Sequence, residues 1–428
     1  MTLSWLSIIR LGLVQTALGA IVVLTTSTFN RLMVVELSLP AILPGFLVAL
    51  HYGIQITRPK WGFKSDTGGN RTRWIILGMI ALALGGSLAA LSVILLELYF
   101  AIGLGTAIIA YALIGLGVGA SGTSVLALLA TATAPRRRAA AATITWLMMI
   151  AGIAITAGTV GAFLNPYSPE LLLRIVIIVC GGAVLMTILA VQGIERGITI
   201  EHHADPMPFF QGLREIWDEP KARNFTIFVF LSMVAYFMQE LILEPYTGLV
   251  FDFTPGQSTS LSGAQNGGVF FGMLTVGIAA TGLKIGALRH WVIAGCLGSA
   301  VSLGVIAMIG QITWTAMVVP SVIALGFFNG MFAVAAIGAM MALAGDGRKA
   351  REGTRMGLWG AAQAVAAGFG GLLGAGAVDI LRHLNTNTAQ AFGTVFVAEA
   401  TLFVAAAILA ARIMDHRPKL TAHMVPGE

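Results

Sequence analysis

The segment "GFKSDTGGNRTR" (62–73) lies between two long apolar runs, 39–57 and 74–96. Charged residues gather at few other places in this chain of 428 residues, of which 57% are hydrophobic and only 10% charged. Soluble domains carry about 25% charged residues. A bilayer crossing needs about 20 consecutive apolar residues. The composition therefore predicts an integral membrane protein, in which residues 62–73 form a loop between two membrane spans.

The apolar runs repeat along the whole chain. They fall at 11–33, 39–57, 74–96, 101–133, 140–163, 171–193, 224–250, 261–283, 291–310, 313–344, 356–380 and 390–412. None alternates with the period of two that a transmembrane β-strand shows, and a helix satisfies its own backbone in lipid. We therefore predict an all-α membrane protein with twelve transmembrane helices.

The basic residues give the expected orientation. With the N-terminus inside, 22 of the 25 Lys and Arg residues fall at the termini or in loops on the same side. Cytoplasmic loops carry such an excess of positive charge. We therefore expect both termini in the cytoplasm, and we interpret the net charge of +6 as a topology signal, not as a sign of a nucleic-acid partner.

The longest loop divides the runs into two sets of six. Within it, "PFFQGLREIWDEPKARNF" (208–225) places apolar residues at helical spacing between charged ones, which predicts a short amphipathic helix on the membrane surface. The expected division is an N-terminal bundle (1–193), a cytoplasmic linker (194–223), a C-terminal bundle (224–413) and a cytoplasmic tail (414–428).

The two halves resemble each other. Gly115 and Gly119 in "IGLGVGASG" (114–122) recur 211 residues later as Gly326 and Gly330 in "LGFFNGMFA" (325–333), and a basic loop follows each pair. A period near half the chain indicates two structural repeats. Two six-helix repeats with cytoplasmic termini favour the major facilitator architecture.

The loop quoted at the start agrees with that architecture. Gly62, Asp66, Gly69 and Arg71 resemble the facilitator loop motif, in which the Asp caps a helix and pairs with Arg. The resemblance implies a latch between the cytoplasmic ends of the two bundles. Thr67 stands where that motif usually has a basic residue, which weakens the expectation of ordinary transporter gating.

Acidic residues inside apolar runs are the main candidates for a functional site, because burying a charge in lipid is costly. In "FMQELILEPYTGLVF" (237–251), Glu240 and Glu244 lie one helical turn apart, after Gln239. Pro245 lacks a backbone N–H and so frees the carbonyl group of Leu241. We expect a polar patch in the outer leaflet that faces a partner; the alternative is that Glu244 is solvated at the membrane interface.

Three further places carry polar groups at or near membrane depth. Glu399 is expected near the midplane, either at a functional site or as a protonated acid that packs between helices. His51 could ligate a metal, including the magnesium of a chlorin, or be a hydrogen-bonded core residue. "NR" (30–31) and Glu36 could form an outer polar cluster, although the sequence favours a solvated hairpin.

No Ser/His/Asp arrangement, phosphate loop or His/Cys cluster occurs in the sequence. We therefore expect neither an enzyme nor a free metal site.

Three strings point to a particular family: "STFNRLMVVELSLPAILPGFLVALHY" (27–52), "MQELILEPYTGLVF" (238–251) and "GTRMGLWGAAQAVAAGFGGLLGA" (353–375). With them, nearly the whole chain resembles the bacteriochlorophyll delivery family, the facilitator branch that contains the antenna assembly factors PucC and LhaA. The resemblance implies a pigment-handling role in the inner, intracytoplasmic membrane of a phototrophic bacterium. It also implies bound bacteriochlorophyll or its geranylgeranylated precursor, with geranylgeranyl reductase, bacteriochlorophyll synthase or light-harvesting polypeptides as partners.

A chlorin with a long tail is apolar, so its site should be an apolar cleft with a few polar anchors. The candidate pigment- or partner-binding residues are Gln239, Glu240, Glu244, Tyr246, His51 and Glu399, which could bond ring carbonyls or ligate magnesium. Two alternatives stay open: a proton-coupled secondary transporter, since membrane carboxylates serve as proton relays, and a scaffold that binds light-harvesting polypeptides without pigment.

Overall fold

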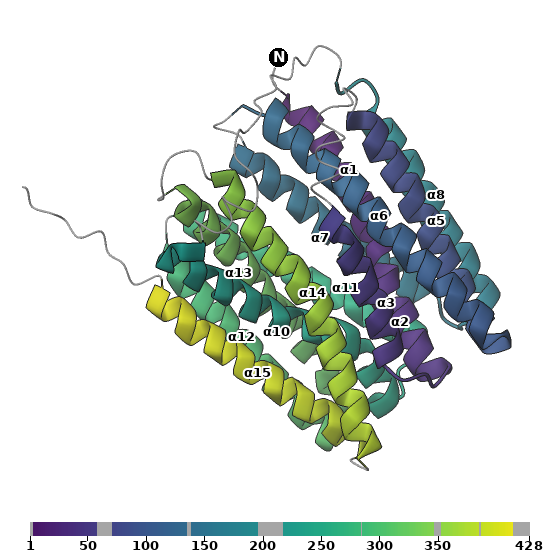
Figure 1. The fold of residues 1–428 in the computed structure, drawn as a ribbon. Coiled ribbons are helices and arrows are strands. Elements are labelled where there is room, and N and C mark those ends of the chain that lie inside the picture. The colour runs from purple at the N-terminus through teal and green to yellow at the C-terminus, as the bar shows by residue number, and fades with distance from the viewer. Residues whose placement is uncertain are drawn as a thin grey trace, which may run out of the picture.

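The computed structural model describes residues 3–57, 71–134, 138–195, 217–283, 285–345, 352–384 and 387–413, and the described residues are helical without any strand. Figure 1 shows the arrangement. The α-helices are α1 (Trp5–Val23), α2 (Phe29–Arg31), α3 (Ile42–Ile54), α5 (Arg71–Leu98), α6 (Phe100–Ala132), α7 (Arg138–Phe163), α8 (Pro169–Val191), α10 (Pro220–Phe251), α11 (Pro255–Val276), α12 (Leu288–Gln311), α13 (Val318–Gly345), α14 (Glu352–His383) and α15 (Thr388–Ile413). Two π-helical turns, η1 (Leu24–Thr28) and η2 (Leu32–Glu36), join α1 and α2 into one helix that ends at Glu36. A third, η5 (Gly277–Gly282), extends α11.

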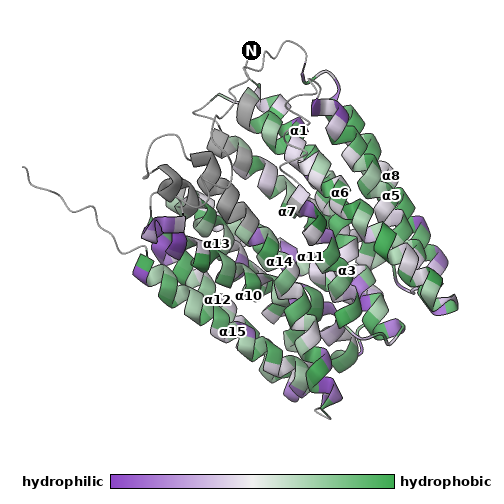
Figure 2. Ribbon diagram, in the orientation of Figure 1, coloured by the Kyte–Doolittle hydropathy of each residue, from purple (hydrophilic) through white to green (hydrophobic). Residues whose placement is uncertain are grey.

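Within the described ranges, ten helices are long and apolar enough to cross a membrane. Figure 2 shows apolar residues along most of their length. The prediction of an all-helical membrane protein is confirmed, whereas the predicted number of twelve crossings is met only in part. The two segments that fall short are α3, with 13 residues, and α11, whose first half, "PGQSTSLSGAQNGG" (255–268), is polar.

The two halves of the chain pack in the same way, which gives the internal repeat a physical basis. In the first half, α1 packs against α7 and α8, α5 against α6 and α8, and α3 against α6. In the second half, α10 packs against α14 and α15, α12 against α13 and α15, and α11 against α13. The repeated glycines lie at equivalent contacts: a Cβ on Gly115 would lie 2.6 Å from the His51 carbonyl oxygen, and one on Gly326 would lie 2.0 Å from that of Gln265.

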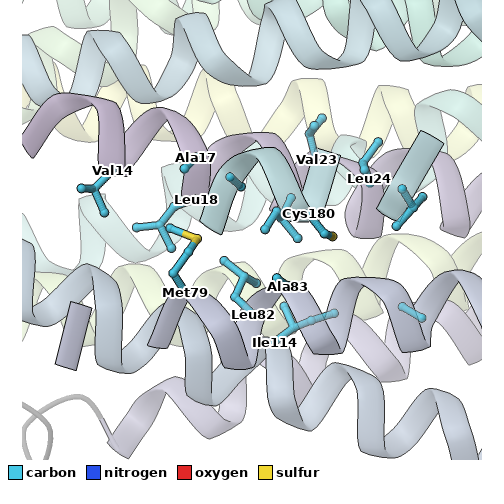
Figure 3. Packing of buried hydrophobic residues seen from close by; sticks show 14 of the residues in the cluster. Val14, Ala17, Leu18, Val23, Leu24, Met79, Leu82, Ala83, Ile114 and Cys180 are labelled. Carbon is cyan, nitrogen blue, oxygen red and sulfur yellow. The ribbon is translucent and has the colours of Figure 1, made fainter. Parts of the chain in front are cut away.

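Each half has its own apolar core. One large cluster of buried hydrophobic residues comes from the first half of the chain, together with Leu241 of α10, and a second comes from α10–α15. Figure 3 shows part of the first, where Leu18 of α1 lies beside Met79 and Leu82 of α5, near Cys180 of α8. Cys180 and Cys296 are both buried and free.

The two bundles meet along two pairs of helices, α7 with α11 and α3 with α14, and α10 also contacts η1, α2 and η2. The start of α1 and the end of α15 lie at one end of the molecule (Figure 1). We call the opposite end, where α2 lies, the distal end. The seam between α10, α11 and the α1–η2 helix at this end holds most of the buried polar side chains discussed below.

Candidate functional site

The polar stretch "TTSTFNR" (25–31) of the first helix faces α10 and α11 across the seam between the bundles. The two π-helical turns lie on either side of α2, and such turns are frequent at functional sites. Together these helices form a mostly buried group that we call the distal polar cluster. Its members are Thr26, Ser27, Thr28, Asn30, Arg31, Glu36, Glu240, Glu244, Thr259 and Ser262.

The carbonyl group that Pro245 frees finds a partner in the other bundle. Pro245 lies inside the continuous helix α10 and cannot donate to the carbonyl oxygen of Leu241. The side-chain nitrogen of Asn30 donates to this oxygen at 2.5 Å, and Asn30 is fully buried. The sequence predicted the freed carbonyl but not the residue that binds it.

The expectation of a solvated hairpin at residues 30–36 is wrong. Arg31 is only 2% exposed; it forms an ion pair with Glu36 and donates to the carbonyl oxygen of Phe253 at 2.5 Å. The first helix continues to Glu36 instead of ending near residue 33. Its last turns therefore pack against α10, and η1 also packs against α11. The side chain of Glu36 is 39% exposed and thus forms the rim of the cluster.

Glu244 occupies the centre of the cluster. It is 3% exposed, so the alternative of a solvated interfacial carboxylate does not hold. Neither of its carboxylate oxygens has a hydrogen-bond partner among the described residues, although Ser27, Ser262 and Arg31 lie around it. The hydroxyl oxygens of Ser27 and Ser262 are 2.8 Å apart. The hydroxyl groups of Ser27 and Ser262 are therefore the nearest donors to this carboxyl group, which can accept a hydrogen bond from either of them.

Glu240 lies one turn closer to the middle of α10 and is only half-buried. Thr26 of the first helix and Tyr236 of α10 are its polar neighbours. The structure thus brings both acids of α10 to the seam, where Glu240 remains partly accessible and Glu244 does not.

Gln239 and Tyr246 lie on a different face of α10, inside the C-terminal bundle. The Tyr246 hydroxyl donates to the Ile306 carbonyl oxygen at 2.6 Å, and its ring contacts Phe396 at a centroid distance of 5.0 Å. Gln239 is buried as well. Neither residue joins the distal polar cluster.

Glu399 of α15 is also separate from the cluster. It is fully buried, and neither carboxylate oxygen has a partner in the part of the chain that the structure describes. Phe396, about one turn before it, contacts Tyr246, and Phe403, one turn after it, contacts Phe332. Glu399 therefore lies among aromatic rings in the core of the C-terminal bundle.

His51 is buried in α3, where its Nε2 lies 2.9 Å from the side-chain nitrogen of Gln55. Its ring contacts Tyr52 edge-on, and Tyr52 in turn contacts Phe237 of α10 at 5.7 Å between ring centroids. His51 thus has the hydrogen bond expected of a core histidine. The Tyr52–Phe237 pair forms an aromatic bridge between the bundles.

Sequence reasoning missed the hydroxyl pairs and one acid. Thr28 and Thr259 lie 3.2 Å apart across the seam, as a second pair beside Ser27 and Ser262. Asp379 of α14 accepts hydrogen bonds from the backbone N–H groups of Ala41 and Ile42 at 3.0 and 2.6 Å. The sequence signal for the hydroxyl pairs was the run of Ser and Thr residues in each of the two helices that carry them.

Three residues of the expected loop latch, Gly62, Asp66 and Gly69, lie outside the described residues. The part of the expected surface helix that precedes Trp217 lies outside them as well. Arg71 begins α5, where its backbone N–H donates to Glu195 at 2.9 Å and its guanidinium to the Ala127 carbonyl oxygen at 3.0 Å. Ala127 belongs to α6 of the N-terminal bundle, and Glu195 follows the end of α8. These two hydrogen bonds of Arg71 therefore join the start of α5 to α6 and to the chain after α8, not to the C-terminal bundle.

The architecture is that of major facilitator transporters. The chain is similar to a bacterial homolog of the human lysosomal transporter Spinster in an inward-facing, unoccupied conformation, with a TM-score of 0.68, 16% identity and coverage of 95% of this chain and 96% of that one. It is also similar to the nucleoside transporter NupG, with a TM-score of 0.68, 11% identity and coverage of 97% and 100%. At these identities the likeness shows the fold alone.

The family follows from the sequence matches. The family model described as PUCC protein matches residues 28–417, so the chain belongs to the PUCC protein family. The chain is 66% identical to the "Bacteriochlorophyll synthase 44.5 kDa chain" of Rhodobacter capsulatus, with coverage of 97% of both chains. It is 29% identical to "Protein PucC" of Cereibacter sphaeroides, with coverage of 91% of this chain and 87% of the relative. The resemblance noted from the sequence is confirmed, and the chain is a multi-pass membrane protein of this family.

Proposed function

We propose that this protein binds or delivers bacteriochlorophyll, or its geranylgeranylated precursor, during the assembly of photosynthetic complexes or the maturation of the pigment tail. The observation that carries the proposal is the 66% identity, over nearly the full chain, to a relative named for bacteriochlorophyll synthesis. We further propose that the protein is not itself the synthase, because its fold is that of transporters. Geranylgeranyl reductase, bacteriochlorophyll synthase and light-harvesting polypeptides are the proposed partners.

The accessible part of the seam fits such a pigment best. Tyr52, Phe237 and Glu240 are each partly exposed, whereas Glu244, Gln239, Tyr246 and Glu399 are buried. Aromatic faces stack against flat apolar rings, and a carboxylate oxygen suits magnesium, which prefers oxygen ligands. We therefore propose that Glu240 anchors the chlorin beside the Tyr52–Phe237 bridge, and that Glu244 supports it from the closed side.

The pigment content of the purified protein tests this site. The wild type is purified from a phototrophic host in mild detergent, and its absorption spectrum is compared with that of a Glu240→Ala, Glu244→Ala double variant. We expect bound pigment in the wild type and loss of most of it in the variant. Glu97→Ala is the matched control, because Glu97 is an exposed acid at the end of α5. A wild type without pigment, or a double variant that folds and keeps the wild-type pigment content, contradicts the proposed site.

For the membrane topology, we propose that α3 and α11 complete twelve crossings in two six-helix bundles, with both termini in the cytoplasm of an intracytoplasmic-membrane protein. Each packs within its bundle as the equivalent helix of the other bundle does. Cysteines at Leu98, the last residue of α5, and at Leu384, directly after α14, should react with a membrane-impermeant maleimide in intact cells. A cysteine at Trp217 should react only after the membrane is opened.

A proton-coupled secondary transporter is the second candidate, because the fold is shared with transporters and Glu244 and Glu399 are buried acids without hydrogen-bond partners among the described residues. Proteoliposomes that accumulate a solute in response to a pH gradient would favour this function. Purified complexes that retain light-harvesting polypeptides but never pigment would favour the pigment-free scaffold instead.

A further inference from the structure

Among the described residues, the side-chain hydrogen bonds between the two bundles gather in one zone. In the described ranges, the side-chain hydrogen bonds that join the bundles come from residues 27–42 of the first half. Ser27 pairs with Ser262, Thr28 with Thr259, and Asn30 with the Leu241 carbonyl oxygen. All of these side chains are buried, so water does not compete for their bonds.

Two structural features of one bundle depend on the other. The start of α3 lacks a cap from its own first residue, and Asp379 of α14 satisfies the backbone N–H groups of Ala41 and Ile42 instead. In α10, the Leu241 carbonyl oxygen has lost its helical donor to Pro245 and is bound by Asn30. Separation of the bundles at the distal end would leave both a helix start and a helix interior with unsatisfied backbone groups.

The neighbouring pair of helices is in backbone contact. A Cβ on Gly161 of α7 would lie 2.4 Å from the Ser260 nitrogen of α11, and one on Gly256 would lie 2.5 Å from the Gly161 carbonyl oxygen. A third glycine, Gly263, would place a Cβ 2.5 Å from the Gly158 nitrogen. Small residues at such positions let transmembrane helices approach closely. The close contact therefore extends along α7 and α11 beyond the polar groups.

We infer that the distal end is a permanent seal: the two bundles stay joined there throughout the working cycle, and the cargo enters and leaves without passing this end. The seal differs from alternating access, in which each end opens in turn. The contacts above are the observations that support the seal, while the identity of the cargo as a pigment rests on the proposed function. An apolar pigment fits this route, because it can enter from the bilayer and needs no aqueous path across the membrane.

A disulfide across the seal tests the inference. Ser27→Cys and Ser262→Cys place two sulfur atoms where the hydroxyl oxygens lie 2.8 Å apart, close to the S–S bond length of about 2.0 Å. The double variant is produced in a phototrophic host that lacks the native gene, oxidised in its membranes and compared with its reduced form and with both single variants. The readouts are pigment bound to the protein and the yield of light-harvesting complexes.

We expect the oxidised double variant to match its reduced form in both readouts. A loss of function on oxidation that reduction restores, and that the single variants do not show, overturns the seal. If no variant, including the wild type, binds pigment, the proposed function fails, while the yield of complexes still tests the seal.

A distance measurement covers the case in which the disulfide does not form. Spin labels at Leu98→Cys and Leu384→Cys, one on each bundle at the distal end, report the separation directly; Cys180 and Cys296 are buried and should stay unlabelled. We expect a single distance population that does not change between detergent and lipid or on addition of bacteriochlorophyll. A second, longer population under any of these conditions overturns the inference.

Discussion

Glu244 and Glu399 are both buried acids, yet their surroundings differ. Glu244 lies in the seam between the bundles, among the hydroxyl groups of Ser27 and Ser262 and the guanidinium of Arg31. Glu399 lies within one bundle, between the aromatic contacts of Phe396 and Phe403. The seam is polar and rich in small residues, whereas each bundle interior is apolar. The comparison teaches that the burial of an acid does not by itself mark a functional site; the chemistry of its neighbours does.

The largest effect is expected where backbones touch across the seam. Gly161→Val would force α7 and α11 apart, because even a Cβ meets backbone atoms of Gly256 and Ser260. We expect a loss of about 3 kcal/mol in the free energy of unfolding, as overpacked sites lose 1–3 kcal/mol or more. Thermal unfolding in detergent measures it. Gly181→Val is the control, since nothing lies within 4 Å of a Cβ there; equal losses in the two variants would show that the seam is not tightly packed.

Next comes the bond to the freed carbonyl group. Asn30→Leu leaves the Leu241 oxygen buried without a donor, so we expect a loss of about 2 kcal/mol in stability. In a Pro245→Ala background the same change should cost about 1 kcal/mol less, because residue 245 then supplies the N–H group. A double-mutant cycle of unfolding free energies gives this coupling, and a coupling near zero would contradict the assigned bond. Asn266→Leu serves as the control, because Asn266 donates only within its own helix.

Replacing each of the two acids by Leu should change the free energy of unfolding in opposite directions. Glu399→Leu replaces a carboxyl group among aromatic rings by an apolar side chain, and we expect unchanged or higher stability. Glu244→Leu removes the acceptor that Ser27, Ser262 and Arg31 surround, and we expect a loss of about 1 kcal/mol. Chemical unfolding of both variants under one set of conditions compares them. A larger loss for Glu399→Leu would reverse the comparison.

The smallest effect is expected at Tyr246. Tyr246→Phe removes one hydrogen bond to the Ile306 carbonyl oxygen and keeps the ring contacts, so stability should fall by about 1 kcal/mol. Pigment content should stay at the wild-type level, because the hydroxyl group points into its own bundle. A selective loss of pigment would place Tyr246 in the binding site after all.

Much of the fold was predictable because lipid imposes simple rules. Apolar runs of sufficient length mark most of the helices, and the recurrence of Gly115 as Gly326 marks the repeat. The helix α11 was harder to delimit: the sequence placed its apolar run at 261–283, but the helix begins at Pro255. The first half of α11 is polar and packs against α7 of the other bundle. A search for apolar runs finds segments that face lipid and therefore misses this half.

For the candidate site, the sequence by itself determined that α10 carries two acids one turn apart and that Pro245 leaves the Leu241 carbonyl group unbonded. Those statements need only the local geometry of a helix. Only the tertiary structure decided that Asn30 binds this carbonyl group, that Arg31 is buried, and that Tyr246 faces away from the seam. These facts depend on which helices pack together and on the rotation of each about its axis, and contacts between residues some 200 positions apart leave no local signal in the sequence.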